Sequence, residues 1–149
     1  MKIVGTPPDW AMTILRAEAR RHHRKLPDVT WQITRKLHAT AGSYSLPEHP
    51  LDDDKIWIRQ GRSRLRAKLA WLHEIAHWLS GEGHSHTFWL KAWELYRRYR
   101  LPIGYVLRDE SHYRQGALWA YQASRDRRGR WPATHVIIKT SISTLPKES

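Results

Sequence analysis

The chain has 149 residues, of which 40% are hydrophobic, and this suits one globular domain with a single modest core. Cysteine is absent, which excludes disulfides and a cysteine-based zinc ribbon, so any zinc must be held by His, Asp or Glu. The formal net charge of +12 favours contact with nucleic acid, anionic surfaces or acidic proteins.

The composition also predicts where the protein resides. The apolar runs are far shorter than the roughly 20 residues of a membrane span. The first ten residues, MKIVGTPPDW, have Pro and Asp where a signal peptide is apolar. We therefore expect a cytoplasmic protein with no membrane partner, while the oligomeric state stays unknown. A single domain is expected over residues 1–149, with a core at about 7–139 and a C-terminal tail at about 140–149.

A helix and a small sheet are predicted for the first 60 residues. Thr6 is in the position of an N-cap and two prolines follow it, so a helix is expected from about Pro7 to Lys25. From Val29 to Gln60 apolar residues alternate and turn-forming residues separate the runs. This pattern predicts two or three strands of a mainly antiparallel sheet, the middle one around Thr40 to Leu46.

The strongest periodicity lies between Ser63 and Ser80. Apolar residues recur at i, i+4, i+7, i+11 and i+14 and form a narrow stripe on a helix: Leu65, Leu69, Leu72, Ala76 and Leu79. Gly81 is placed where a left-handed C-cap ends a helix, and Gly83 allows a second tight turn. The chain is therefore expected to reverse direction at this point.

Further elements are predicted after this turn. A helix with an aromatic face is expected from about Ser85 to Arg100, and another from about Ser111 to Ser124. A charged loop at Arg125 to Arg130 and a short strand at Thr134 to Lys139 follow.

The residues HEIAH, at positions 73–77, carry the clearest chemistry in the chain. Residues four apart in a helix lie on one side of it, so His73 and His77 can reach one metal ion. Glu74 projects from a neighbouring face, where a carboxylate can contact a metal-bound water without being a ligand. A hydrolytic zinc site usually has three protein ligands, and His84 and His86 are both candidates for the third.

The string HEIAHWLSGEGHSHTFW resembles the short zinc metallopeptidases of the SprT-like and YgjP-like kind, which include small metallohydrolases of actinobacteria and phages. These proteins carry HExxH, a short turn, and then His-Gly/Ser-x-x-Phe at the start of the next helix. The resemblance implies an α+β, minimal zincin-like domain with an N-terminal helix, a small sheet, the HExxH helix and a second, ligand-bearing helix. It assigns the third ligand to His84 rather than His86.

Zinc-dependent hydrolysis of peptide bonds is the leading hypothesis, with a protein or peptide as the substrate. Zn²⁺ held by His73, His77 and His84 would lower the pKa of its bound water toward about 7. Glu74 would be the catalytic general base. The strand with Ile56-Trp57-Ile58 is expected at a sheet edge, where it can pair with an extended substrate. Candidates to orient a ligand imidazole are Glu82, Glu94 and Asp109.

A basic nucleic-acid-binding module with a structural or vestigial zinc site is the alternative, and hydrolysis of a non-peptide bond is a third possibility. The basic clusters lie at Arg20–Lys25, Arg62–Lys68, Arg97–Arg100 and Arg125–Arg130. The chain also has nine tryptophans, more than one core usually needs, and several are expected to be partly exposed. Arginine stems laid over their indole faces are the simpler interpretation, and stacking on nucleic-acid bases is the other.

Overall fold

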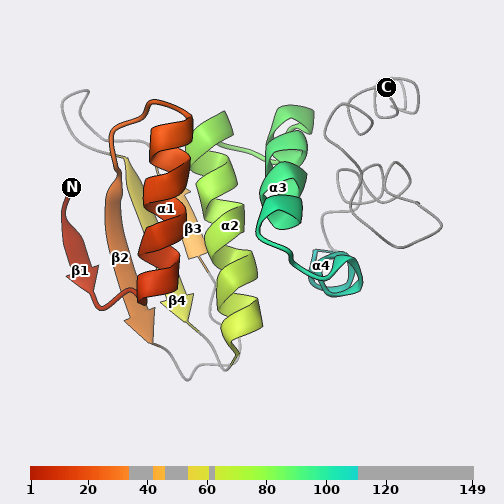
Figure 1. The fold of residues 1–149 in the computed structure, drawn as a ribbon, viewed down its shortest axis with the longest axis horizontal. Helices are drawn as coiled ribbons and strands as arrows, with labels where there is room; N and C mark the ends of the chain where they lie inside the picture. The colour runs from red at the N-terminus through yellow and green to blue at the C-terminus, as the bar shows by residue number, and fades with distance from the viewer. Residues whose placement is uncertain (34–41, 46–53, 61–62, 111–149) are drawn as a thin grey trace. The chain divides into compact units, whose positions relative to one another are not determined.

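The computed structural model describes residues 1–33, 42–45, 54–60 and 63–110. The chain forms two compact units, Met1–Glu82 and a second that begins at Gly83. A single domain over residues 1–149 therefore stays a prediction. The elements in chain order are β1 (Ile3–Gly5), α1 (Asp9–Arg21), β2 (Asp28–Ile33), β3 (Gly42–Ser45), β4 (Lys55–Gln60), α2 (Arg64–Ser80), α3 (His86–Arg98) and α4 (Ile103–Asp109) (Figure 1).

The first unit contains one four-stranded sheet in the order β1-β2-β4-β3. β1, β2 and β4 are parallel, and only β3 is antiparallel to its neighbour β4. A mixed α+β fold is thus confirmed, and the three predicted strands are present, but the mainly antiparallel sheet is wrong. The reason is that β3 pairs on the far side of β4, which leaves β2 and β4 as parallel neighbours. Alternation of apolar residues indicates which side chains face the core, not the direction of the adjacent strand.

The strand β1 was not predicted, because three residues are too few for a periodic pattern. It pairs with β2 in parallel, with Ile3 opposite Val29. The Lys2 backbone N–H also donates to Asp28 Oδ1 at 2.6 Å. Gly5 has a φ of +84°, and a Cβ on this residue would lie 1.9 Å from the carbonyl oxygen of Trp31. Close approach of the two strands therefore requires glycine at this position.

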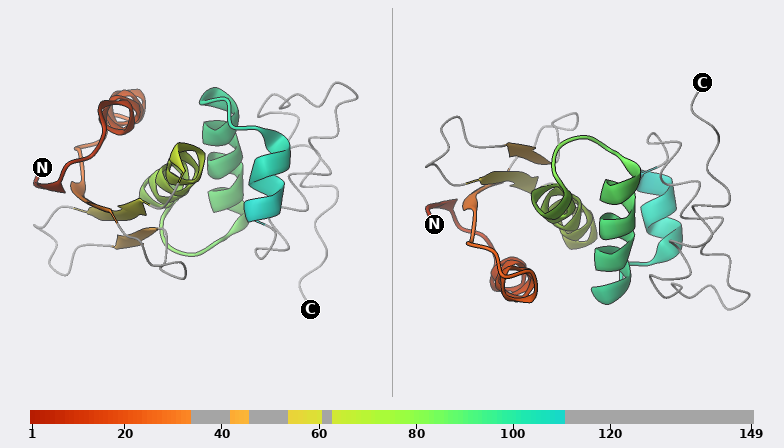
Figure 2. Two further views of the ribbon diagram at one scale, coloured as in Figure 1. Left: turned by 90° about the horizontal axis from the view of Figure 1, so that it is seen from below. Right: turned by 90° about the horizontal axis from the view of Figure 1, so that it is seen from above.

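The core of the first unit lies between the sheet and two helices. Val29, Trp31, Ile56 and Ile58 are buried on one face of the sheet. Figure 2 shows α1 and α2 on the same face. The Trp31 ring joins both helices, since its centroid lies 5.9 Å from that of Trp10 on α1 and 5.4 Å from that of Trp71 on α2. These edge-to-face aromatic contacts fix the two helices against β2.

The helix α1 is shorter than the sequence predicted. It begins at Asp9, and its N-cap is Pro8 with no side-chain hydrogen bond, so the expected Thr6 cap is wrong. Pro7 precedes another proline, and such a residue is sterically kept out of the helical region. The helix ends at Arg21, because His23 adopts a left-handed conformation with a φ of 51°.

The helix α2 matches its prediction closely. The Ser63 side chain caps it by accepting from the Arg66 backbone N–H at 3.1 Å. Gly81, with a φ of 100°, follows its last residue, Ser80. The structure differs in one respect: every residue from 71 to 78 is buried, so the second half of α2 is enclosed on all sides rather than along one stripe.

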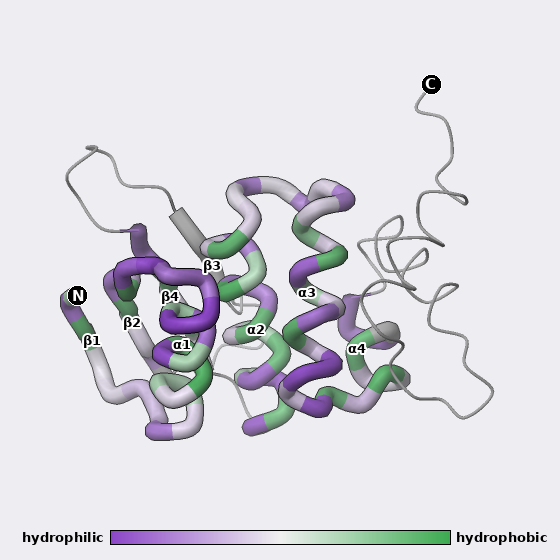
Figure 3. The backbone as a smooth tube through the Cα atoms, turned by 45° about the horizontal axis from the view of Figure 1, so that its top comes forward, coloured by the Kyte–Doolittle hydropathy of each residue, from purple (hydrophilic) through white to green (hydrophobic). Residues whose placement is uncertain are grey.

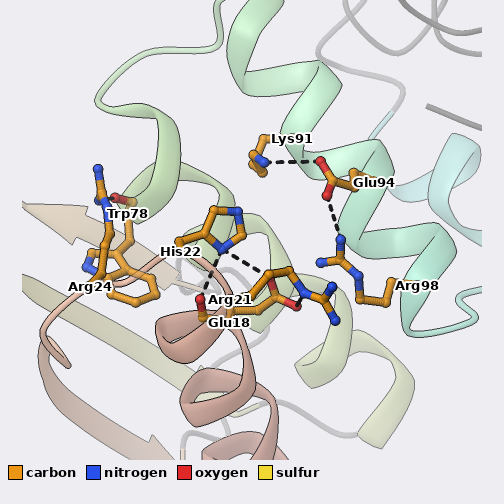
Figure 4. A network of polar contacts seen from close by, with 8 residues as sticks. All are labelled: Glu18, Arg21, His22, Arg24, Trp78, Lys91, Glu94 and Arg98. Carbon is orange, nitrogen blue, oxygen red and sulfur yellow. Dashed lines mark hydrogen bonds and ion pairs between the residues drawn. The ribbon is translucent and has the colours of Figure 1, made fainter. Parts of the chain in front are cut away.

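In the second unit, the Ser85 side chain caps α3 by accepting from the Phe88 backbone N–H at 3.2 Å. Glu94 bonds to Lys91 at 3.1 Å and to Arg98 at 2.5 Å on the same helix (Figure 4). Burial raises the pKa of this carboxyl, but the hydrogen bonds and charges of Lys91 and then Arg98 outweigh it and hold the pKa below its usual range.

The helix α4, which the sequence did not predict, follows Leu101-Pro102. The Tyr96 hydroxyl donates to Glu110 Oε1 at 2.6 Å, and both residues are buried. The helix predicted at 111–124, the loop, the strand at 134–139 and the tail lie outside the described residues. Among α1 to α4, none combines the length and apolar character that crossing a membrane requires.

Candidate metal centre

Three histidines form the one group, among the described residues, that could hold a metal ion. His73, His77 and His84 each offer a ring nitrogen, and these atoms all lie within 4.8 Å of one another. His86, the other candidate for a third ligand, is not part of this group. The structure therefore brings together the three side chains expected from the sequence.

The donor set fits a tetrahedral Zn²⁺ ion. Zn–N bonds of about 2.1 Å in a tetrahedral site place the nitrogens roughly 3.4 Å apart. The separation of any pair of the three nitrogens therefore exceeds this value by about 1.4 Å at most. Imidazole also suits Cu, Fe and Ni, so these residues do not by themselves select the metal.

The helix α2 positions the first two ligands. His73 and His77 are one turn apart, and their ring centroids lie 5.0 Å from each other at 67°. They are 7% and 8% exposed, in the part of the helix that is enclosed on all sides. Burying two imidazoles among Trp, Leu and Ile residues is costly unless their ring nitrogens have partners. A bound metal ion would provide one such partner for each ring.

His77 has an orienting contact outside the metal group. Its Nδ1 lies 3.1 Å from the carbonyl oxygen of Gly81. A carbonyl only accepts, so Nδ1 donates and the lone pair of the neutral ring is on Nε2. Ligand imidazoles in zinc sites commonly have this second bond. The sequence predicted a carboxylate, from Glu82, Glu94 or Asp109, as the group that orients a ligand imidazole. Glu94 instead bonds to Lys91 and Arg98, and Glu82 and Asp109 are exposed.

His84 is exposed and is held by aromatic neighbours from α3. Its ring packs edge-on against Phe88, with centroids 5.0 Å apart, and is stacked on Trp89 at 5.9 Å and 30°. The indole of Trp89 was not singled out from the sequence. Its position five residues after a candidate ligand, at the start of an amphipathic helix, is the signal that was available.

Glu74 is next to His73 and is only 6% exposed. Its carboxylate is not in the metal group, which contains histidines alone. A carboxylate at this depth is expensive to bury, so apolar side chains would serve packing better. Glu74 thus follows a candidate ligand in the chain without belonging to the histidine group, which is the arrangement expected from the sequence.

The segment that follows α1 contacts the last turn of α2, close in sequence to His77. An Arg24 guanidinium nitrogen donates to the Trp78 carbonyl, and its Cζ lies 5.8 Å from the Trp78 ring centroid (Figure 4). A cation here satisfies a carbonyl near the negative end of the helix dipole. Fully buried Glu18 lies nearby in α1, with its carboxylate 3.7 Å from Arg21 Nε and 3.5 Å from His22 Nδ1.

One expectation about the substrate path is wrong. The strand β4, which contains Ile56-Trp57-Ile58, is internal, because β2 pairs on one side of it and β3 on the other. Its backbone groups are already paired and cannot receive an extended peptide. The edges of the described sheet are β1 and β3.

Comparisons with protein families, with curated proteins and with solved structures gave no match. The resemblance to SprT-like and YgjP-like metallopeptidases therefore depends on the sequence, with the HEIAHWLSGEGHSHTFW string as its specific part and the order of the predicted elements as a looser similarity.

Proposed function

We propose that this chain is a zinc-dependent metallopeptidase. The observation that carries the proposal is the convergence of three imidazole nitrogens within 4.8 Å, with a buried carboxylate at the residue that follows His73 in the chain, Glu74. Three neutral nitrogen ligands leave one tetrahedral position open, as in catalytic rather than structural zinc sites. The minimal zincin-like fold and the assignment of His84 as the third ligand belong to the same proposal.

The chain's own residues have distinct tasks in this mechanism. His73, His77 and His84 would hold the ion, with His77 oriented by its bond to Gly81. A bound Zn²⁺ would supply Lewis acidity toward the scissile carbonyl and lower the pKa of a coordinated water toward about 7. Glu74 accepts a proton from the attacking water and passes it to the amine nitrogen as the C–N bond breaks.

The metal site is tested by comparing His84→Ala with His86→Ala. We expect wild-type protein, first stripped of metal with a chelator that is then removed, to bind one added Zn²⁺ ion. With that ion bound it should hydrolyse an unfolded protein substrate. His84→Ala removes one of three ligands, so its Zn²⁺ affinity should fall by at least 100-fold and its hydrolysis should be lost. His86→Ala is the matched control and should retain both. Competition with a zinc-binding dye and a casein assay provide the two measurements, and equal affinities for the two variants would contradict the site.

Nucleic-acid binding is a second candidate function, favoured by the surface of α1. Arg16 and Arg20 are exposed on this helix and Lys25 is exposed in the turn after it, and Figure 3 shows the end of α1 as hydrophilic. Two arginines of the other predicted clusters are less available for contacts with phosphates. Arg98 is bonded to Glu94, and Arg64 lies over the Trp10 ring at 5.6 Å.

Salt dependence tests this second candidate. If α1 contacts phosphates, affinity for a DNA duplex should fall steeply with salt, with a slope of about 0.9 per phosphate neutralised. Arg16→Gln combined with Arg20→Gln should reduce the slope by about two. Arg108→Gln, an exposed cation on α4, is the control. Fluorescence anisotropy at several salt concentrations measures the slope, and an equal loss in the control would assign the binding to net charge alone.

A further inference from the structure

We infer that Gly81 is a positioning residue of the metal centre, whose carbonyl fixes the tautomer of His77 so that Nε2 is presented to the ion. The inference rests on the metal site of the proposed function. It concerns a residue that contacts neither metal nor substrate and acts only through His77.

Two hydrogen bonds join these residues in a closed ring. The Gly81 backbone N–H donates to the His77 carbonyl at 2.7 Å, and His77 Nδ1 lies 3.1 Å from the Gly81 carbonyl. The first is the i→i−4 bond of the C-cap residue of α2, and the second uses the same residue to restrain the imidazole. Because a carbonyl has no proton to donate, the ring must carry its proton on Nδ1. Rotation of the ring or a change of tautomer would break that bond.

The conformation of Gly81 explains why this position needs glycine. Its φ of 100° and ψ of −178° lie in a region that is essentially restricted to glycine. A Cβ built on Gly81 meets nothing within 4 Å, so crowding is not the obstacle. Any other residue must therefore change the backbone angles, and this change turns the carbonyl away from His77. The requirement for glycine is thereby coupled to the orientation of a metal ligand.

Gly83 provides a matched control in the same turn. It too has a positive φ, of 83°, and a Cβ on it would meet nothing within 4 Å. Substitution at either position strains the turn, because both glycines have a positive φ. Loss of the contact with His77 is expected only at position 81.

The experiment compares Gly81→Ala with Gly83→Ala. Long-range ¹H–¹⁵N spectra of metal-free protein at about pH 8, where an ordinary imidazole is neutral, report the tautomer of His77. We expect Nδ1–H in wild type and in Gly83→Ala, and a mixture of tautomers in Gly81→Ala. Zn²⁺ affinity, measured by dye competition, should fall about 10- to 100-fold in Gly81→Ala. It should change about threefold or less in Gly83→Ala.

Three results would overturn the inference. These are an Nε2–H tautomer in metal-free wild type, an unchanged tautomer and affinity in Gly81→Ala, and an equal affinity loss in both variants. The wild-type spectrum decides the matter even if Gly81→Ala fails to fold. Failure of wild type to bind Zn²⁺ would instead contradict the proposed function, and the tautomer would still report whether Gly81 restrains His77.

Discussion

Glu74→Gln is expected to retain Zn²⁺ at close to wild-type affinity while hydrolysis of a peptide substrate falls by about 10²- to 10⁴-fold. The range is the usual contribution of a positioned general base. Glutamine has nearly the same shape as glutamate but cannot accept the proton of the attacking water, so the change removes chemistry and preserves volume. The carboxylate is not in the histidine group, and metal affinity should therefore depend little on it.

Three measurements separate the possible outcomes for this variant. Dye competition gives the Zn²⁺ affinity, hydrolysis of unfolded casein gives the rate, and circular dichroism checks that α2 is intact. Glu82→Gln is the control, because Glu82 is an exposed carboxylate eight residues further along the chain. Cleavage at the wild-type rate by Glu74→Gln would contradict the mechanism. Loss of both metal and activity would make Glu74 a structural support of the site rather than its base.

The sequence was most informative where short-range chemistry decides the structure. The bounds of α2 were predicted from the apolar period and from Gly81, and both are local features. The start of α1 was misplaced because the steric effect of Pro8 on Pro7 overrides the capping preference of Thr6. The helix α4 was missed because seven residues after Pro102 span barely two turns and show little periodicity.

The direction of the strands could not be read from the sequence, because it depends on which strands become neighbours. Val29, Trp31, Ile56 and Ile58 would face a core in either a parallel or an antiparallel pair. The strand β3 pairs with β4 on the side away from β2, so β2 and β4 become parallel neighbours. The same long-range arrangement makes β4 internal and removes it as a partner for an extended substrate.

The candidate site was predictable to the level of residue types and spacing. His73, Glu74 and His77 follow from helical geometry, and the local resemblance selected His84 over His86. The contact of His77 with Gly81 and the stacking of His84 on Trp89 were not predicted. Both depend on ring orientations and backbone angles that residue letters do not encode. Ring orientation determines which nitrogen faces the metal, so these supporting contacts complete the description of the site.

The tryptophans serve mainly as core residues. Of the seven in the described part of the chain, five are buried: Trp31, Trp71, Trp78, Trp89 and Trp93. The expectation that arginines lie over indole faces is confirmed for Arg24 on Trp78 and Arg64 on Trp10. Only Trp10 and Trp57 of these seven are partly exposed, so fewer are available for stacking on bases than the composition suggested.

Trp71→Ala is expected to lower the free energy of unfolding of the first unit by about 3–5 kcal/mol, the usual cost of truncating a large buried aromatic residue. Trp71 is fully buried, packs edge-on against Trp31, and donates from Nε1 to the Ala11 carbonyl at 2.9 Å. It thereby joins α2, β2 and α1. A loss of this size is a large fraction of a typical domain stability of about 5–15 kcal/mol. Zn²⁺ affinity should fall with it, because α2 carries His73 and His77.

The matched control is Trp57→Ala, which removes an indole from the other face of the sheet. Trp57 is only partly buried and bonds to the exposed Gln32 side chain at 3.3 Å, so its loss should cost about 1 kcal/mol or less. Hydrogen exchange at the Val29 and Ile56 amides measures the opening free energy of the sheet in each variant. Equal destabilisation by the two changes would contradict the conclusion that the Trp10-Trp31-Trp71 contacts fix both helices to the sheet. A large loss in Trp71→Ala alone, accompanied by weaker Zn²⁺ binding, would show that the packing of α2 on β2 supports the geometry of the metal centre.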